Sequence, residues 1–173
     1  MKKSTVILSW AIYTSIVYIV VYEVTNNPDH PNKALGWIGY LIFLAGLILG
    51  TFMYRKANGG YLTFGEGYKA GLLMTLVIAV ALTIHYFVYL QMHPDLPEKL
   101  LAQVQAQMVN SGMQPDAIDK ALSVDRMMFK PVPMVIIGLL VSVLTGAILS
   151  LVSAGVSIKN KPFIEDDNSS NLQ

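Results

Sequence analysis

Residues 55–71 read RKANGGYLTFGEGYKAG, a short polar stretch between two apolar segments that are each long enough to cross a lipid bilayer. Thr63 and Glu66 fit the capping-box pattern S/T-x-x-E/Q. In that pattern the Thr63 hydroxyl accepts a hydrogen bond from the Glu66 N–H, and the Glu66 carboxylate accepts one from the Thr63 N–H. A helix is therefore predicted to start here. A functional interpretation is also open, because Arg55, Lys56 and the helix N-terminus could bind an anion or a lipid headgroup.

The composition indicates a membrane protein. Of the 173 residues, 54% are hydrophobic and only 13% are charged, whereas a soluble domain has about 25% charged residues. The net charge of +1 gives no reason to expect a nucleic-acid partner. The chain contains no cysteine, which excludes disulfides, thiolate nucleophiles and cysteine-ligated metal sites.

Four apolar segments, residues 5–24, 35–54, 68–90 and 134–158, reach the length of about 20 residues that a helix needs to cross about 30 Å of hydrocarbon. Lipid offers no hydrogen-bond partners to the backbone, so each segment is predicted to be a helix. The first segment follows two lysines, but it is too long for the apolar core of a signal peptide, so we expect it to be retained. The predicted fold class is all-α: an integral membrane four-helix bundle, residues 1–158, with a flexible tail at residues 159–173.

Basic residues near the ends of the predicted spans indicate the orientation, because Lys and Arg are enriched on the cytoplasmic side. Those close to span ends gather on one side: Lys2, Lys3, Arg55, Lys56, Lys69, Lys159 and Lys161. The opposite side holds the rest, mostly deep within a long loop: Lys33, Lys99, Lys120, Arg126 and Lys130. Both termini and the 55–71 loop are therefore predicted to be cytoplasmic. Residues 26–33 and 91–133 are predicted to face outward.

The long outer connection is predicted to be an extramembrane αα-hairpin, residues 97–128, between the third and fourth membrane helices. Its first half places Leu100, Leu101, Val104 and Met108 on one helical face, and Pro115 begins a second helical pattern. The hairpin could fold onto the outer ends of the spans, lie in the membrane interface, or dock a partner.

Small residues recur at helical spacing within three of the spans. In lipid such residues let helix backbones approach closely, and helices associate through these contacts. The stripes contain Gly138, Ser142, Gly146, Ser150 and Ala154 in the fourth span, Gly67, Gly71, Thr75, Ala79 and Thr83 in the third, and Gly46 and Gly50 in the second. Three interpretations are open: packing within one chain, a homodimer seam along the fourth span, and a substrate path lined by hydroxyl groups.

Two ionisable residues lie near the outer ends of the spans, where such residues are candidates for function. From the predicted span ends, Glu23 and His85 are expected about five residues, or roughly 7–8 Å, apart along the membrane normal. A pair between them is not indicated by this spacing. His85 is therefore interpreted as a neutral packing residue, with a role in proton transfer or ligand binding as the alternative.

The stretch R-K-x-x-G-G-Y-L-T-F-G-E-G-Y-K-A-G, with a span on either side, resembles the central hairpin of domain-of-unknown-function family 4199, small membrane proteins from Bacteroidota. The most specific part is T-F-G-E-x-x-K-x-G, carried by Thr63, Phe64, Gly65, Glu66, Lys69 and Gly71. The resemblance covers about residues 4–158. It implies the same four-span layout and a place in the bacterial inner membrane, but it implies no activity.

No residue pattern predicts catalysis. The histidines His30, His85 and His93 lack the spacing of a metal site, and no serine lies beside a base. We therefore expect no enzyme activity, cofactor or metal. The function expected is that of a structural, assembly or partner-binding membrane subunit, with the lipid bilayer, a second copy or another membrane protein as partner. The alternative is a small transporter or channel, although charged or broken spans would then be expected near the midplane.

Overall fold

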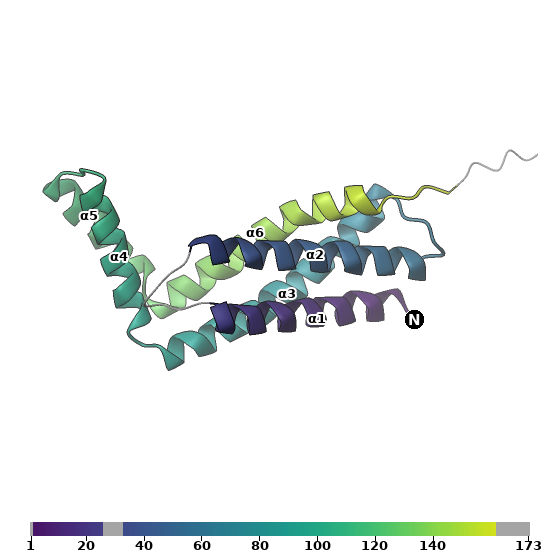
Figure 1. Cartoon of the computed structure of the whole chain (residues 1–173), viewed down its shortest axis with the longest axis horizontal. Helices are drawn as coiled ribbons and strands as arrows, with labels where there is room; N and C mark the ends of the chain where they lie inside the picture. The colour runs from purple at the N-terminus through teal and green to yellow at the C-terminus, as the bar shows by residue number, and fades with distance from the viewer. Residues whose placement is uncertain (1, 26–32, 162–173) are drawn as a thin grey trace, which may run out of the picture.

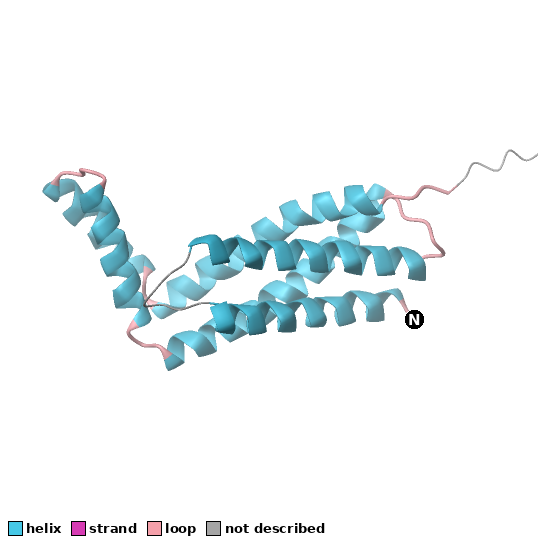
Figure 2. Ribbon diagram, in the orientation of Figure 1, coloured by secondary structure: helices cyan, strands magenta, loops and turns pink. Residues whose placement is uncertain are grey.

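The computed structural model describes residues 2–25 and 33–161, and the part of the chain that it describes is helical apart from short connections. Figures 1 and 2 show the helices in order along the chain: α1 (Lys3–Thr25), α2 (Lys33–Ala57), α3 (Phe64–Met92), α4 (Leu96–Asn110), α5 (Pro115–Met128) and α6 (Pro131–Ser157). The helices α1, α2, α3 and α6 are long and apolar enough to cross a membrane. The prediction of an all-α protein with four candidate membrane spans is thus confirmed.

All four long helices begin earlier than the predicted spans, and the third and the last show why. The third starts at Phe64 and not at residue 68, because the capping box at Thr63 already satisfies its first N–H groups. The last starts at Pro131 and not at residue 134, so Pro131 and Pro133 form part of its first turn. Proline is tolerated there, since the N–H that it lacks would have no partner within the helix.

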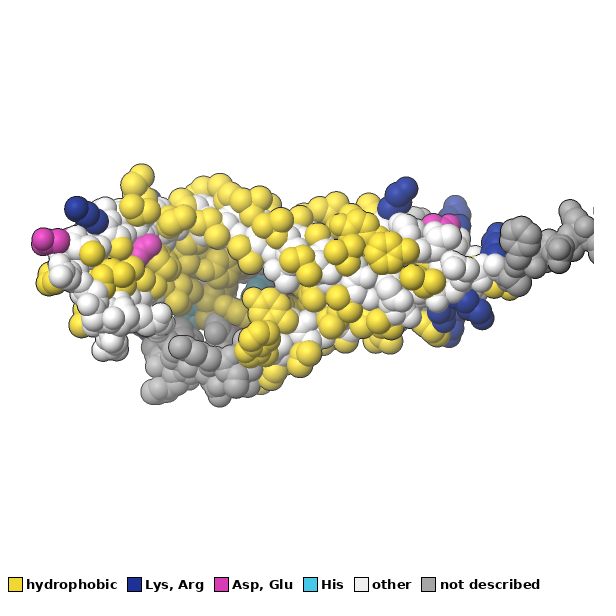
Figure 3. All heavy atoms as spheres, turned by 90° about the horizontal axis from the view of Figure 1, so that it is seen from above, with side chains coloured by type: hydrophobic (Ala, Val, Ile, Leu, Met, Phe, Trp, Pro, Cys, Tyr) yellow, Lys and Arg dark blue, Asp and Glu magenta, His cyan; other side chains and the backbone are white. Residues whose placement is uncertain are grey.

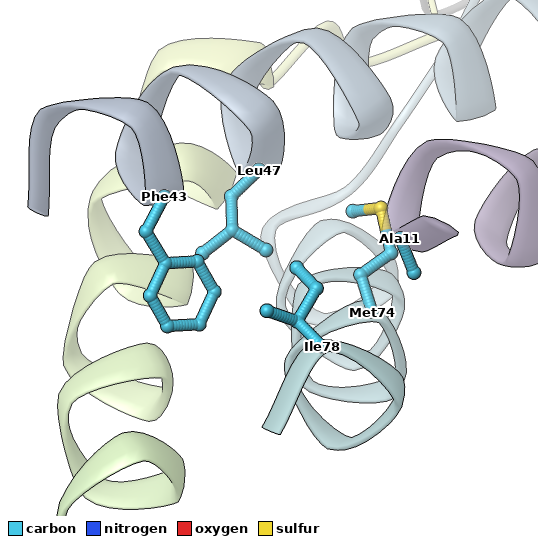
Figure 4. Close-up of a cluster of buried hydrophobic side chains, with 5 residues drawn as sticks. All are labelled: Ala11, Phe43, Leu47, Met74 and Ile78. Atoms are coloured by element: carbon cyan, nitrogen blue, oxygen red, sulfur yellow. The ribbon is translucent and has the colours of Figure 1, made fainter. Parts of the chain in front are cut away.

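The four long helices pack side by side, with α3 in contact with each of the other three. Its largest interface is with α6, while α2 also contacts α1 and α6. Figure 4 shows the centre of the packing, where the buried side chains from three helices meet: Ala11, Phe43, Leu47, Met74 and Ile78. Hydrophobic side chains also cover the outer surface along the bundle, as expected of helices that face lipid (Figure 3).

Small residues bring α3 and α6 together. A Cβ atom on Gly71 would lie 2.9 Å from the Cβ of Ser150, and one on Gly67 would lie 3.3 Å from the Cα of Ala154. A Cβ atom on Gly146 would collide with the Thr75 side chain. Gly146, Ser150 and Ala154 of the fourth-span stripe are therefore buried in the packing of α3 and α6 within one chain.

The glycines of α2 allow close packing against α1 and α3. A Cβ atom on Gly46 would collide with Thr14 of α1, and one on Gly50 would lie 2.5 Å from the Met74 Sδ of α3. Hydroxyl groups add polar contacts: Ser153 Oγ donates to Thr51 Oγ1 at 2.9 Å, which joins α6 to α2. Such bonds between helices stabilise a bundle in lipid because no water competes for the groups.

The connection between α2 and α3 is a tight turn followed by the capping box. Gly59 and Gly60 have φ angles of +79° and +88°, which glycine adopts without a steric penalty. Thr63 N donates to Glu66 Oε2 at 3.0 Å, and Glu66 N donates to Thr63 Oγ1 at 3.3 Å. The Glu66 carboxylate also lies at the positive end of the helix dipole.

Gly146→Leu is expected to destabilise the protein by about 3 kcal/mol or more, because the new side chain has to displace Thr75 and Phe43. Gly155→Leu is the matched control, since nothing lies within 4 Å of its Cβ position on the same helix. Thermal unfolding in detergent, together with the mass of the particle, measures the effect. An unchanged melting temperature for Gly146→Leu would contradict the packing described.

Thr63→Ala is expected to lower stability by about 1 kcal/mol, because the Glu66 N–H loses its acceptor at the start of α3. Thr63→Ser keeps the hydroxyl group and is expected to melt close to the unaltered protein. Equal melting temperatures for the alanine and serine variants would show that the cap contributes nothing.

Candidate functional site

The loop between α2 and α3 is attached to the end of α6. Leu62 N donates to Lys159 O at 2.8 Å and Lys159 N donates to Leu62 O at 3.0 Å, which forms an isolated antiparallel bridge. Arg55 Nη1 donates to Ser157 O at 3.1 Å and so satisfies a carbonyl group at the helix C-terminus. Lys159, assigned to the flexible tail from the sequence, is therefore held by two backbone bonds. Residues 162–173 of that tail lie outside the described residues.

The predicted loop residues have separate roles. Thr63 and Glu66 bond to each other in the capping box, and Arg55 is used within the protein, where it also lies 4.3 Å from the centroid of the Phe52 ring. Lys56 remains exposed. Other exposed lysines lie at the same end of the molecule, where Figure 3 shows dark blue side chains gathered: Lys3, Lys69, Lys159 and Lys161. This end of the bundle can attract anionic headgroups.

Glu23 and His85 form a direct pair near the opposite end of the bundle. His85 Nε2 lies 2.7 Å from Glu23 Oε1, and the two side chains are 20% and 49% exposed. The spacing in the sequence did not indicate this pair, in which the two side chains join α1 to α3.

Aromatic rings surround this pair. Tyr22 packs edge-on against both His85 and Tyr89, with 5.7 Å between ring centroids in each case. His93 follows one turn later, with its ring centroid 4.4 Å from that of Tyr89. The contacts of Tyr22 with His85 and Tyr89 join α1 to α3 near this end of the bundle.

A cavity of about 600 Å³ lies beside the pair, and Figure 3 shows the hollow between the bundle and the α4–α5 hairpin. The outer members of the predicted fourth-span stripe, Gly138 and Ser142, line this cavity and do not pack against α3 as the inner members do. Its walls come mainly from α1, α3, α5 and α6: Tyr18, Tyr22, Leu82, Thr83, His85, Tyr86, Asp125, Met128, Phe129, Met134, Val135, Ile137, Gly138, Leu139, Val141 and Ser142, with Leu100 of α4.

Asp125 is the functional candidate that sequence reasoning missed. Its Oδ2 atom is buried and has no hydrogen-bond partner among the described residues. Asp125 follows Ile118 and Leu122, the two buried residues of α5, at helical spacing, so the buried face of α5 ends in a carboxylate. That register was visible in the sequence, although the cavity that it faces was not.

The α4–α5 hairpin turns away from the axis of the bundle (Figure 1). Its two helices pack on each other, α5 contacts α6, and Leu96 at the start of α4 packs against Tyr89 and Met134. At the beginning of α4, Lys99 Nζ lies 3.0 Å from Asp95 Oδ2, and this hydrogen bond lowers the pKa of Asp95. The hairpin exposes several large apolar side chains: Val109, Met113, Val124, Met127 and Met128.

Within the described ranges, no three His, Asp or Glu side chains are grouped as metal ligands. No curated protein and no solved structure is significantly similar to the chain. A family described as a protein of unknown function matches residues 6–159, which is most of the sequence. With its four helices of membrane-spanning length, the chain therefore belongs to the DUF4199 family of proteins of unknown function.

Proposed function

We propose that this membrane protein is a non-enzymatic subunit that binds another membrane protein through its α4–α5 hairpin. The observation that carries this proposal is the apolar surface of the hairpin, which stands clear of the bundle. Val124 and Met127 are 57% and 66% exposed, although α5 belongs to none of the candidate membrane spans. Burial of a large apolar side chain that lies outside the hydrocarbon is favourable, so the binding of a partner that covers these residues would be stabilised.

The charges of the hairpin favour a protein partner over a lipid surface. The segment carries four acidic side chains, Glu98, Asp116, Asp119 and Asp125, against three basic ones, Lys99, Lys120 and Arg126. Helices that lie on anionic membranes have a polar face rich in Lys and Arg. Methionine side chains, which adapt to irregular surfaces, form part of the exposed face instead.

The distribution of basic residues supports a bacterial inner-membrane protein with both termini in the cytoplasm. Lys56 and Lys69 are exposed at the end of the bundle where α2 meets α3, and Lys3 is exposed at the start of α1. This is the distribution expected of the cytoplasmic side. The hairpin and its partner are then on the outer side.

A transporter is the second candidate, because the cavity and the pair of Glu23 and His85 place polar groups within the outer half of the bundle. In the inner half the contact of Gly71 with Ser150 leaves no room for a path between α3 and α6. A transporter would therefore require these helices to separate. Solute flux in liposomes containing the purified protein distinguishes the two functions.

The orientation predicts opposite labelling of two single-cysteine variants, since the chain has no cysteine of its own. Gly65→Cys lies at the start of α3 with nothing within 4 Å of its Cβ position, and Ser111→Cys lies at the exposed tip of the hairpin. In spheroplasts, which have lost the outer membrane but keep the inner membrane intact, a membrane-impermeant maleimide is expected to label position 111 only. Labelling of both positions, or of position 65 alone, would contradict the orientation.

The partner proposal predicts a specific crosslink from α5. A photoreactive benzoylphenylalanine at Met127 is expected to give one protein adduct of defined mass in native membranes, and Val124→Asp is expected to abolish it. The same group at Gln107, an exposed polar position on α4, is the control and is expected to give no adduct of that mass. Adducts with lipid alone would contradict a protein partner, and an adduct with a second copy would identify a homo-oligomer instead.

A further inference from the structure

The outer cavity has the dimensions and the lining of a small-molecule site. Its volume of about 600 Å³ lies within the range of about 300–1,000 Å³ that such sites occupy. The residues of α6 that line it run from Met134 to Ser142, which corresponds to a depth of about 12 Å along the helix. Most of the lining is aliphatic or aromatic, so the greater part of a ligand would be apolar.

One side chain in the cavity wall, that of Asp125, is a carboxylate with an oxygen that is unpartnered among the described residues. The Oδ2 atom of Asp125 is buried and unpartnered within the described part of the chain. The adjacent Arg126 and the nearby Lys130 are exposed, and neither bonds to this oxygen. Asp125 borders the cavity, and a carboxylate oxygen without a donor in such an apolar setting destabilises the protein. A rotation of the Asp125 side chain would bring this oxygen to the cavity surface, where a donor on a ligand would satisfy it.

The second ionisable group of the cavity is already satisfied. His85 Nε2 is held by Glu23 Oε1 at 2.7 Å, so this nitrogen is engaged by a carboxylate and is not presented to a ligand. An anion that entered the cavity would be repelled by the carboxylate of Asp125. The carboxylate of Glu23, which is bonded to His85, would repel it as well. The charges of this region therefore oppose anions and favour cations.

The aromatic side chains that line the cavity also favour a positively charged ligand. Tyr18 and Tyr22 of α1 and Tyr86 of α3 all border the cavity. The face of an aromatic ring carries negative charge and attracts an ammonium group, particularly where water is excluded. A carboxylate and several tyrosine rings around an apolar pocket together match an amine with an apolar chain.

We propose that the cavity between α1, α3, α5 and α6 binds an amphipathic amine. Its ammonium group bonds to Asp125 at the outer end, and its apolar chain lies against Leu82 and Val141. The amine belongs either to a lipid headgroup or to a free small molecule, and the recognition chemistry is the same for both. This site goes beyond the partner-binding role of the hairpin and does not depend on it.

The test compares three probes of one shape and different charge: 4-phenylbutylamine, 4-phenylbutanol and 4-phenylbutyrate. Binding to the full chain is measured by calorimetry in an uncharged maltoside detergent at neutral pH. The amine is expected to bind at least tenfold more tightly than the alcohol, and the carboxylate to bind most weakly. Equal affinity for the amine and the alcohol in the unaltered protein would overturn the proposal.

Variants locate the site. Asp125→Asn keeps the shape of the side chain and is expected to remove the preference for the amine while leaving the affinity for the alcohol unchanged. Asp119→Asn is the control, since Asp119 is an exposed carboxylate on the same helix. An unchanged amine preference in Asp125→Asn would overturn the assignment of the ammonium group.

A second variant tests the position of the site even if Asp125→Asn proves too unstable to be measured. Gly138 lines the cavity, and the nearest atom to its Cβ position is a Tyr86 carbon at 3.9 Å. Gly138→Phe is therefore expected to fill the space and to abolish binding of both the amine and the alcohol. Binding of both probes at unchanged affinity would show that they occupy another place.

Lipids distinguish the two sources of the amine. Phosphatidylethanolamine is expected to compete with 4-phenylbutylamine if the natural ligand is a lipid headgroup, whereas phosphatidylglycerol, which lacks the amine, is not. If neither lipid competes while the amine still binds through Asp125, the natural ligand is a free amphipathic amine.

Discussion

The close approach of α3 and α6 is the contact on which the rest of the structure depends. In lipid the hydrophobic effect does not drive helices together, so a bundle is held by van der Waals contact and by bonds between polar groups. The van der Waals contact comes from Gly71 against Ser150 and from Gly67 against Ala154, because these small residues let the backbones come together. A polar contact at the same level joins the hydroxyl groups of Ser150 and Thr75, whose oxygen atoms are 3.3 Å apart.

This contact divides the bundle into two halves with different properties. In the half that holds the α2–α3 loop, α3 and α6 are in direct contact, and the loop is joined to the end of α6 by the bridge of Leu62 and Lys159. In the half next to the hairpin, aromatic side chains such as Tyr22 and Tyr86 line the cavity, and Tyr22 packs against His85.

The helix α5 connects the two outward-facing features. One side of it, with Ile118 and Leu122, is buried, and the same side ends in Asp125 at the wall of the cavity. Its other side exposes Val124 and Met127 to the surroundings. A single short helix thus contributes both the carboxylate of the proposed ligand site and the apolar surface of the proposed partner site.

The sequence by itself determined the local features of this protein. Helices of membrane-spanning length follow from the absence of backbone partners in lipid, and the capping box follows from the spacing of Thr63 and Glu66, since both depend only on near neighbours in the chain. Contacts between distant segments depend on how far each helix extends and how it is rotated about its axis. The pairing of Glu23 with His85 is one such contact, and the position of Asp125 beside the cavity is another. Only the tertiary structure could decide them, because a shift of a few residues between packed helices replaces every contact along their interface.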